Sequence, residues 1–501
     1  MKKIAIFLTT LTVVLASCSD FLDVNKDPNN APNSTPALNL PAGIASAGAR
    51  LATNYNIMGG MWVQYWAQNN GSNQYKGFDG YVVQQSTLNA DFNEIYSGSL
   101  QDLEYARKES KKAADWNLYL MSTVMQCYVY QMMADIYDEI PFDEALQGNI
   151  IPHPHFRPGQ EVYDSLIVRI DEALSKDFKA KTNTDPGKQD LLFVDPDKGT
   201  TVMARWFQFA NTLKLKIYLR QIYARPAVAQ AGINALYAAN AKFLTTSAAM
   251  YQFEDQENKS NPLYEADRRK LNTAENIKAS KTFMDFLVIN DDTLRMKLLF
   301  NAGAKGYRGI EQGNFGASTV EIVPNDISTA AIRATDTLYF MSRAEVLFMQ
   351  AEVAARGMGP GTGAAKGLYD AAVEAAFDRF KLAGAAADYT GSGDVYEYPD
   401  GTLEENLKAI ATQKWIALAG IEGLEMFFER NRLGYPVYSE TTYSDEDNYV
   451  IGDLVYPIGG VTGFGNYPKR LLYPETERNR NPNTPEQVPA TTKVWWDTKP
   501  E

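Results

Sequence analysis

The chain has few residues of the kinds that build metal and disulfide sites. Its 501 residues include two cysteines, Cys18 and Cys127, and two histidines, His153 and His155. A zinc site of the usual Cys and His type lacks enough ligands here. A Ser, His, Asp triad would have to draw on the one proline-interrupted loop that carries both histidines. We therefore expect no metal, no cofactor and no triad chemistry.

Positive charge and long apolar runs are also scarce. Lys and Arg total 48 against 61 Asp and Glu, which gives a formal net charge of −13. Nucleic-acid binding depends on clustered Lys and Arg that replace counterions, so this charge argues against DNA or RNA as a partner. A membrane-spanning helix needs about 20 apolar residues, and no stretch reaches that length without polar interruption. We expect no membrane span.

The first residues predict a signal peptide with a lipid attachment site. Met1–Lys3 supplies positive charge, and Ile4–Leu15 is mostly apolar but too short to span a bilayer. The sequence LASC that ends at Cys18 resembles the bacterial lipobox, in which the cysteine is acylated and becomes the first mature residue. We expect residues 1–17 to be removed, with an ordinary secretory signal as the alternative. Residues 18–40, rich in Asn, Pro, Ser and Asp, are expected to form the lipidated N-terminus and a tether.

Helical periodicity dominates residues 41–501, which we expect to form a single domain. Apolar residues recur at spacings of three and four over residues 117–139, 159–177, 200–224 and 403–432. Two more helical segments, 341–359 and 367–380, are rich in Ala and meet at a Gly-rich break, as in the helix pairs of tetratricopeptide units. Loops and short strands are expected over 225–338 and after 433. The predicted fold is mostly α, with tetratricopeptide-like helix pairs and long loop-rich insertions.

Catalytic motifs are largely missing from the chain. The G-x-S-x-G pattern fails because Ile44 stands where its first Gly should be, and residues 357–367 lack the spacing of a phosphate loop. The acidic segment 444–449 lacks the pattern of an EF-hand, which leaves a structural calcium open. One group of carboxylates could form an acid and base pair, although a solvated loop explains it as well. That group is Asp135, Asp138, Glu139, Asp143 and Glu144.

Residues 58–84 combine aromatic rings with amides. Trp62, Tyr65 and Trp66 share one face of an expected helix, which is more typical of a core than of a ligand site. Asn and aromatic residues then follow among glycines, on an expected loop. Aromatic faces beside amides suit sugar rings and, nearly as well, extended peptides. The predicted ligand-binding residues are Trp66, Asn69, Asn73, Tyr75, Phe78 and Tyr81.

Six segments, in chain order, resemble the signature segments of the SusD/RagB-type lipoproteins of Bacteroidota outer membranes. They cover nearly the whole mature chain, and the run from YDEIPFDEAL into VYDSLIVRIDEAL places the resemblance closest to the SusD-like subgroup. The six segments are CSDFLDVNKDPN, MADIYDEIPFDEAL, WFQFANTLKLKIYLRQ, FMSRAEVLFMQAEVAARG, QKWIALAGIEGLEMFFERNRLGYP and PKRLLYPETERNRNPN.

The resemblance implies a surface nutrient-binding protein and no catalysis. Such a protein is held at the extracellular face of the outer membrane by its lipid anchor alone, here at Cys18, and Asp20 and Asp23 resemble export features of such lipoproteins. It binds a glycan and delivers it to a SusC-like TonB-dependent transporter. A peptide ligand, as in RagB-like members, is the alternative, and an anchored hydrolase that uses Asp138 is a further one. The resemblance indicates the binding region but not individual contacts.

Overall fold

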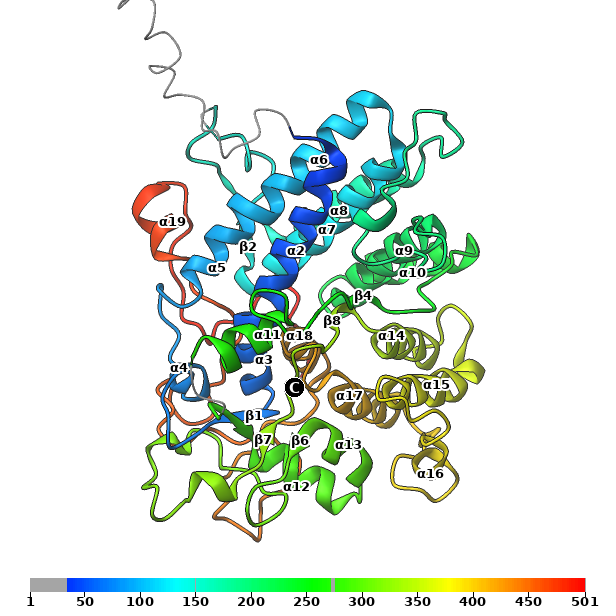
Figure 1. The fold of residues 1–501 in the computed structure, drawn as a ribbon. Coiled ribbons are helices and arrows are strands. Elements are labelled where there is room, and N and C mark those ends of the chain that lie inside the picture. Colours follow the sequence, from blue (N-terminus) through cyan, green and yellow to red (C-terminus); the bar gives the residue numbers. More distant parts are fainter. Residues whose placement is uncertain (1–33, 149, 272–274, 501) are drawn as a thin grey trace, which may run out of the picture.

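The computed structural model describes residues 34–148, 150–271 and 275–500 (Figure 1). Cys18 and the predicted signal peptide lie outside these ranges. Helices make up most of the regular structure. The first are α2 (Pro36–Arg50), α3 (Asn56–Trp62), α4 (Lys76–Asp79), α5 (Asn89–Glu94), α6 (Gln101–Ala113), α7 (Trp116–Tyr137), α8 (Gly159–Leu174), α9 (Met203–Arg220) and α10 (Pro226–Ala238). The others are α11 (Pro262–Tyr264), α12 (Lys281–Ile289), α13 (Thr293–Leu299), α14 (Arg343–Ala355), α15 (Ala365–Asp378), α16 (Ala387–Thr390), α17 (Leu403–Leu418), α18 (Gly423–Leu433) and α19 (Glu475–Arg480).

Short strands form three small antiparallel sheets. The largest has the order β1-β5-β7-β6, in which Trp66 pairs with Ala279 and Thr329 pairs with both Lys278 and Asn301. Two further sheets pair β2 with β3 and β4 with β8. The strands are β1 (Trp66–Gln68), β2 (Glu139–Pro141), β3 (Phe156–Pro158), β4 (Ala248–Met250), β5 (Ile277–Ala279), β6 (Phe300–Asn301), β7 (Thr329–Ala330) and β8 (Leu338–Met341).

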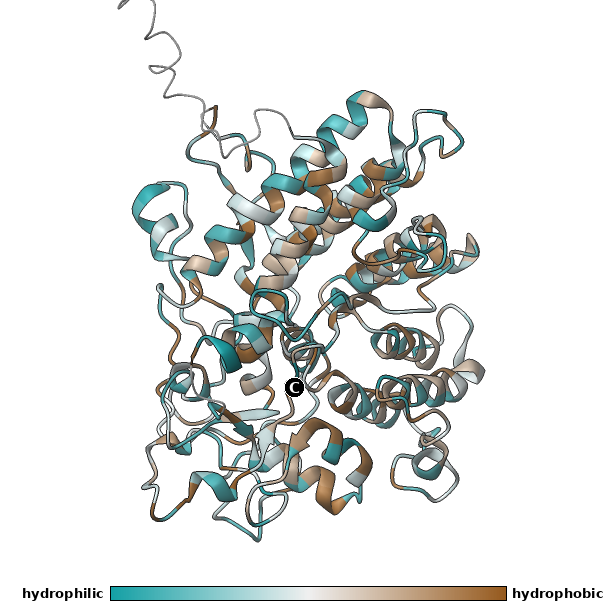
Figure 2. Ribbon diagram, viewed as in Figure 1, coloured by the Kyte–Doolittle hydropathy of each residue, from teal (hydrophilic) through white to brown (hydrophobic). Residues whose placement is uncertain are grey.

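The predicted helix pairs are confirmed. The periodicities over 117–139, 159–177 and 200–224 correspond to α7, α8 and α9, and the two Ala-rich segments form the packed pair α14 and α15. Asp115 begins α7 by accepting a hydrogen bond from the Leu118 amide at 3.3 Å. Figure 1 shows α9, α10, α14, α15 and α17 stacked along one side, away from the loop-rich part that carries β1, β6 and β7. Figure 2 shows hydrophobic residues along α7, whereas α19 is hydrophilic.

Two sequence-based boundaries are wrong. The helix predicted over 403–432 is two helices, because the chain turns at Ala419–Glu422, where Gly420 has a φ of 82°. Tyr65 and Trp66, predicted to lie on one helix with Trp62, are outside it, since α3 ends at Trp62 and Gln64 has a φ of 58°. The Gln64 side chain donates to the Val455 carbonyl, a contact remote in sequence that supports this unusual backbone.

The segments expected to be loops contain more helix than predicted. Helices α10, α12 and α13 lie between residues 225 and 338, beside the expected short strands β4 to β7. Helix α2 begins at Pro36, so the last residues of the expected tether are helical. Among the described residues, no helix has the length and apolarity needed to cross a bilayer.

A cluster of buried charges, which we call the buried ion network, lies between the helix pairs. Arg220 on α9 has a fully buried side chain, and its Nε lies 3.1 Å from an oxygen of Asp135 on α7. Its two Nη atoms bind Glu425, at 2.6 Å, and Glu429 on α18. Further pairs extend the cluster to α14 and α17. They are Lys216 with Glu345 and Glu425, Lys414 with Glu429, and Arg432 with Glu352 and Glu429.

Removal of one partner from this network leaves buried carboxylates without a counter-charge. We expect Arg220→Met to lower the free energy of unfolding by about 3–5 kcal/mol, measured by urea denaturation. The matched control is Lys259→Met, which breaks the exposed Lys259–Glu254 pair and changes stability by less than about 1 kcal/mol. Equal effects of the two substitutions would contradict this prediction.

Candidate functional site

The predicted binding segment is held in place by one buried carboxylate. Asp79, at the end of α4, accepts hydrogen bonds at 3.1 Å from the backbone amides of Gln68 and Gly313. The side chain of Gln312 also donates to Asp79. The next residue, Gly80, accepts a hydrogen bond from the Val461 amide at 3.2 Å. Three segments far apart in the sequence therefore meet at the Asp79–Gly80 turn.

The six predicted ligand-binding residues differ in how much surface they expose. Trp66 is 3% exposed and packs against Gly60. Tyr81 is 1% exposed and lies against the rings of Tyr456 and Tyr467, which leaves little of its face for a ligand to stack on.

The other four predicted residues lie around the same turn. Asn69 is buried, and its side-chain oxygen accepts a hydrogen bond from the Gly71 amide at 3.0 Å. Tyr75 is buried and stacks parallel to the half-buried Phe78, with 6.3 Å between ring centroids. Asn73 is exposed. The role of these residues in binding stays a prediction.

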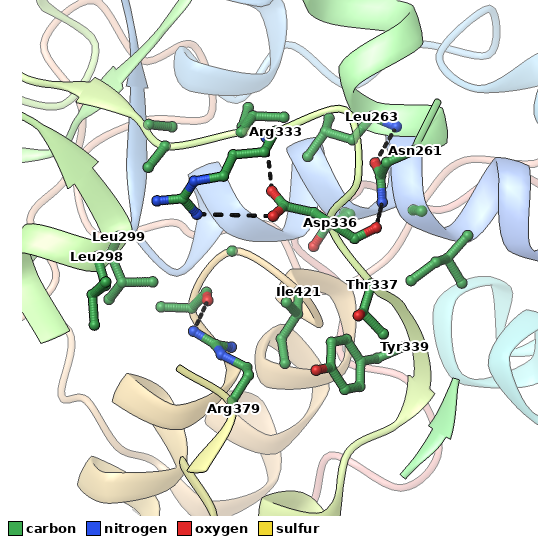
Figure 3. Close-up of a pocket in the computed structure, with 18 of the residues that line it drawn as sticks. Asn261, Leu263, Leu298, Leu299, Arg333, Asp336, Thr337, Tyr339, Arg379 and Ile421 are labelled. Atoms are coloured by element: carbon green, nitrogen blue, oxygen red, sulfur yellow. Dashed lines mark hydrogen bonds and ion pairs between the residues drawn. The ribbon is translucent and has the colours of Figure 1, made fainter. Parts of the chain in front are cut away.

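A cavity of about 540 Å³ lies where the loop-rich part meets the helix pairs (Figure 3). Trp66 at the start of β1 contributes to its wall and is the one predicted ligand-binding residue among the described lining residues. On one side lie α11 and the connection from β7 to β8; on the other lie the end of α15 and the turn between α17 and α18. A cavity of this size suits a small ligand or part of a chain.

Aromatic and polar groups reach this cavity together. Tyr339 on β8 and Phe380 after α15 are half-buried and line it. The Asn261 side chain donates to the backbone carbonyl of Asp336 at 2.9 Å. The carboxylate of Asp336 accepts a hydrogen bond from the Arg333 amide at 2.7 Å, and burial raises its pKa. Half-buried rings beside fixed polar groups can stack on a sugar or peptide and orient it.

Sequence reasoning missed Tyr339, Phe380 and Arg379 as lining residues. Tyr339 comes from a four-residue strand, and the other two follow a helix whose periodicity indicates only packing. No local aromatic and amide pattern surrounds them, unlike residues 66–81. Their grouping is visible only once distant segments are brought together.

Four of the five carboxylates considered for catalysis, all except Glu139, have partners that explain them. Asp135 belongs to the buried ion network. Asp138 accepts a hydrogen bond from the Trp495 amide at 2.8 Å and pairs with Arg470 at 3.1 Å. Asp143 pairs with Arg157, and Glu144 lies 2.8 Å from the ring of His155. In the segment considered for calcium, the Asp445 carboxylate accepts hydrogen bonds from the side chains of Asn448 and Thr441.

The fold and the cavity define a class, a mostly helical protein whose stacked helix pairs support a ligand-sized cavity at their junction with long loops. The chain belongs to a SusD-like family described as "Starch-binding associating with outer membrane", whose model matches residues 29–457. The resemblance seen in the sequence is thereby confirmed at the level of the family. No curated protein matches the chain.

Solved structures share the fold across nearly the whole chain. A protein described as a chitin-binding protein is 21% identical with a TM-score of 0.71, and the match covers 92% of this chain and 100% of that one. A chitin-binding SusD homolog from Flavobacterium johnsoniae is 19% identical with a TM-score of 0.69, covering 92% and 99%. A SusD homolog from Bacteroides thetaiotaomicron is 20% identical with a TM-score of 0.71, covering 94% and 100%.

The buried Asp79 gives the stability of the protein a pH dependence. Burial raises the pKa of this carboxyl from 3.8 to about 7, although its hydrogen bonds oppose the shift. The unfolded state binds this proton only below about pH 4, whereas the folded state holds it up to about pH 7. The stability that this proton contributes is therefore lost as the pH rises through about 7. Burial likewise raises the pKa of Glu422 to about 8 and the pKa of Asp135 to about 6.

We expect the free energy of unfolding to rise as the pH falls from about 8.5 to about 5.5. Urea denaturation at both pH values tests this. Asp79→Asn cannot titrate, so its rise should be smaller than that of the unsubstituted protein. An identical pH slope in the two proteins would show that Asp79 does not titrate in this range.

Proposed function

We propose that the protein is a surface lipoprotein of the outer membrane that binds a glycan and passes it to a SusC-like TonB-dependent transporter. The observation that carries this proposal is the 540 Å³ cavity, where half-buried Tyr339 and Phe380 lie beside fixed polar groups. Aromatic faces stack on the C–H faces of sugar rings, and neighbouring amides and hydroxyls bind sugar hydroxyls. The family description and the two chitin-binding relatives support a glycan rather than another ligand.

The proposed ligand site combines the cavity with the neighbouring turn. Trp66 connects the two, because it lies in the predicted segment and also lines the cavity. Asn69, Asn73, Tyr75, Phe78 and Tyr81 remain the candidate contacts outside the cavity. A ligand longer than one or two sugar units would extend toward these residues.

The proposal assigns binding and no catalysis to this chain. The carboxylates of an anchored hydrolase would need to be free to exchange protons at a substrate. Here Asp138 accepts a hydrogen bond from Trp495 and pairs with Arg470, and Asp135 pairs with Arg220. Each carboxylate therefore stabilises the fold. A peptide ligand would use the same aromatic rings, so sugar and peptide panels should be compared directly.

The cavity rings provide the sharpest test of the ligand site. We expect Tyr339→Ala and Phe380→Ala each to weaken binding of the best glycan by about tenfold in titration calorimetry, because each removes a stacking surface. The control Tyr105→Ala removes a ring on α6, which does not line the cavity, and should leave affinity unchanged. If Asn73→Ala weakens binding and neither cavity variant does, the ligand lies on the turn instead.

The anchor is tested separately from ligand binding. We expect mass spectrometry to find acyl chains on Cys18 in protein from a Bacteroidota host, and the protein to fractionate with the outer membrane. Cys18→Ser should release the domain from the membrane fraction while its glycan affinity stays unchanged. An unmodified Cys18 thiol in the mature protein would rule out the lipid anchor.

A further inference from the structure

The cavity carries an excess of positive charge in a protein whose net charge is −13. Arg333, Arg379 and Lys381 line it, and Asp336 is the one carboxylate among the described residues of its wall. Three cations against one anion leave the lining with a charge of about +2. Arginines on opposite sides of the cavity contribute to it, Arg333 above and Arg379 below in the view of Figure 3. Such a local field attracts an anionic ligand.

Arg379 contributes a cation without a carboxylate partner among the described residues. Its Nη atoms donate to the carbonyls of Ala417, at 3.0 Å, and Ala419, at 3.1 Å, which end helix α17. Its guanidinium also lies 4.2 Å from the ring centre of Phe380. A guanidinium has five N–H donors, so the two hydrogen bonds to carbonyls leave three for a ligand. Capping of α17 therefore explains where Arg379 lies but uses less than half of its donors.

The other two cations are only weakly neutralised. The guanidinium of Arg333 lies 3.8 Å from Asp336, and its side chain is 52% exposed. Lys381 is exposed and follows Phe380 directly, with a φ of 62°. No ion pair to Lys381 exists within the described part of the chain. Both side chains can therefore turn toward an anion in the cavity at little cost.

A second cavity of about 290 Å³ adjoins the first one. Tyr339, Arg379 and Ile421 line both. The second cavity adds the hydroxyl of Thr246, which is buried without a hydrogen-bond partner in the described structure. Arg379 therefore lies between the two cavities, because its side chain lines both of them. An acidic group on a sugar next to Tyr339 would lie beside this guanidinium.

We propose that these adjoining cavities select glycans that carry negative charge, as carboxylate or sulfate groups, over neutral glycans. This inference rests on the proposed glycan-binding function and adds the substrate class. The sugar ring stacks on Tyr339 or Phe380, and its acidic group binds the free N–H groups of Arg379, with Arg333 and Lys381 supplying further positive charge. Arginine suits this role because its planar N–H groups match a carboxylate or a sulfate.

The test compares oligosaccharides of equal length against the full-length lipoprotein in detergent. The probes are oligogalacturonates, their methyl esters, chondroitin sulfate oligosaccharides, and neutral malto- and chito-oligosaccharides. We expect at least one charged series to bind about tenfold or more tightly than both neutral series, and to weaken as salt rises from about 50 to about 500 mM. The galacturonate and sulfate series distinguish a carboxylate ligand from a sulfate ligand, and the methyl esters should lose the advantage of the free acid.

Variants then assign the selectivity to the cavity. Arg379→Gln should lose most of the charged-glycan affinity, so that the charged and neutral series bind about equally. Arg225→Gln, which removes an equal charge from a surface pair with Asp164, should change neither. If Arg379→Gln fails to fold, the double variant Arg333→Gln and Lys381→Gln tests the same charge with surface side chains.

Three results would overturn the inference. The first is equal affinity for neutral and charged glycans, and the second is charged-glycan affinity that Arg379→Gln leaves intact. Either result would contradict charge selection and leave the proposed glycan-binding function unaffected. The third is binding of an acidic oligoglutamate peptide with no binding of any glycan. This result would contradict both charge selection among glycans and the glycan-binding function, because the anion would then belong to a peptide.

Discussion

Arg220 joins three helices through ion pairs that are shielded from water. It reaches Asp135 on α7 and both Glu425 and Glu429 on α18 from its own position on α9. Buried charges cost several kcal/mol each to desolvate, so they are tolerated only where partners lie at hydrogen-bonding distance. This requirement fixes how far the helices can slide or rotate against one another.

Other contacts between the same helices hold the helix-side wall of the cavity. Glu422, just before α18, accepts a hydrogen bond at 3.0 Å from the amide of Ser342, which begins α14. Gly59 and Gly423 let α3 and α18 approach closely, because a Cβ at Gly59 would lie 2.4 Å from the Leu424 backbone nitrogen. The turn that contains Gly420 is held between these contacts. Its residues, with the end of α15, form that wall.

The opposite wall depends on a different kind of contact. Strand β1 leads from Trp66 in the cavity to Gln68, whose amide binds the buried Asp79. Few regular elements support this part, so hydrogen bonds from separate loops to one carboxylate take their place. Arg379, at the end of α15 on the helical side, thus faces Arg333 on the wall built from loops. Variation of such loops can change ligand preference without disturbing the helix pairs.

The sequence by itself determined the long helices α7, α8 and α9 and the pair α14 and α15, since apolar residues at spacings of three and four favour one buried face. It also located the aromatic segment that contains Trp66, and its two Cys and two His residues argue against a metal site of that type. It did not reveal the break at Gly420, because the apolar pattern continues through that turn. The grouping of Tyr339, Phe380 and Arg379 was decided by the tertiary structure alone. These residues have no local pattern in common, and the packing of distant segments brings them to one cavity.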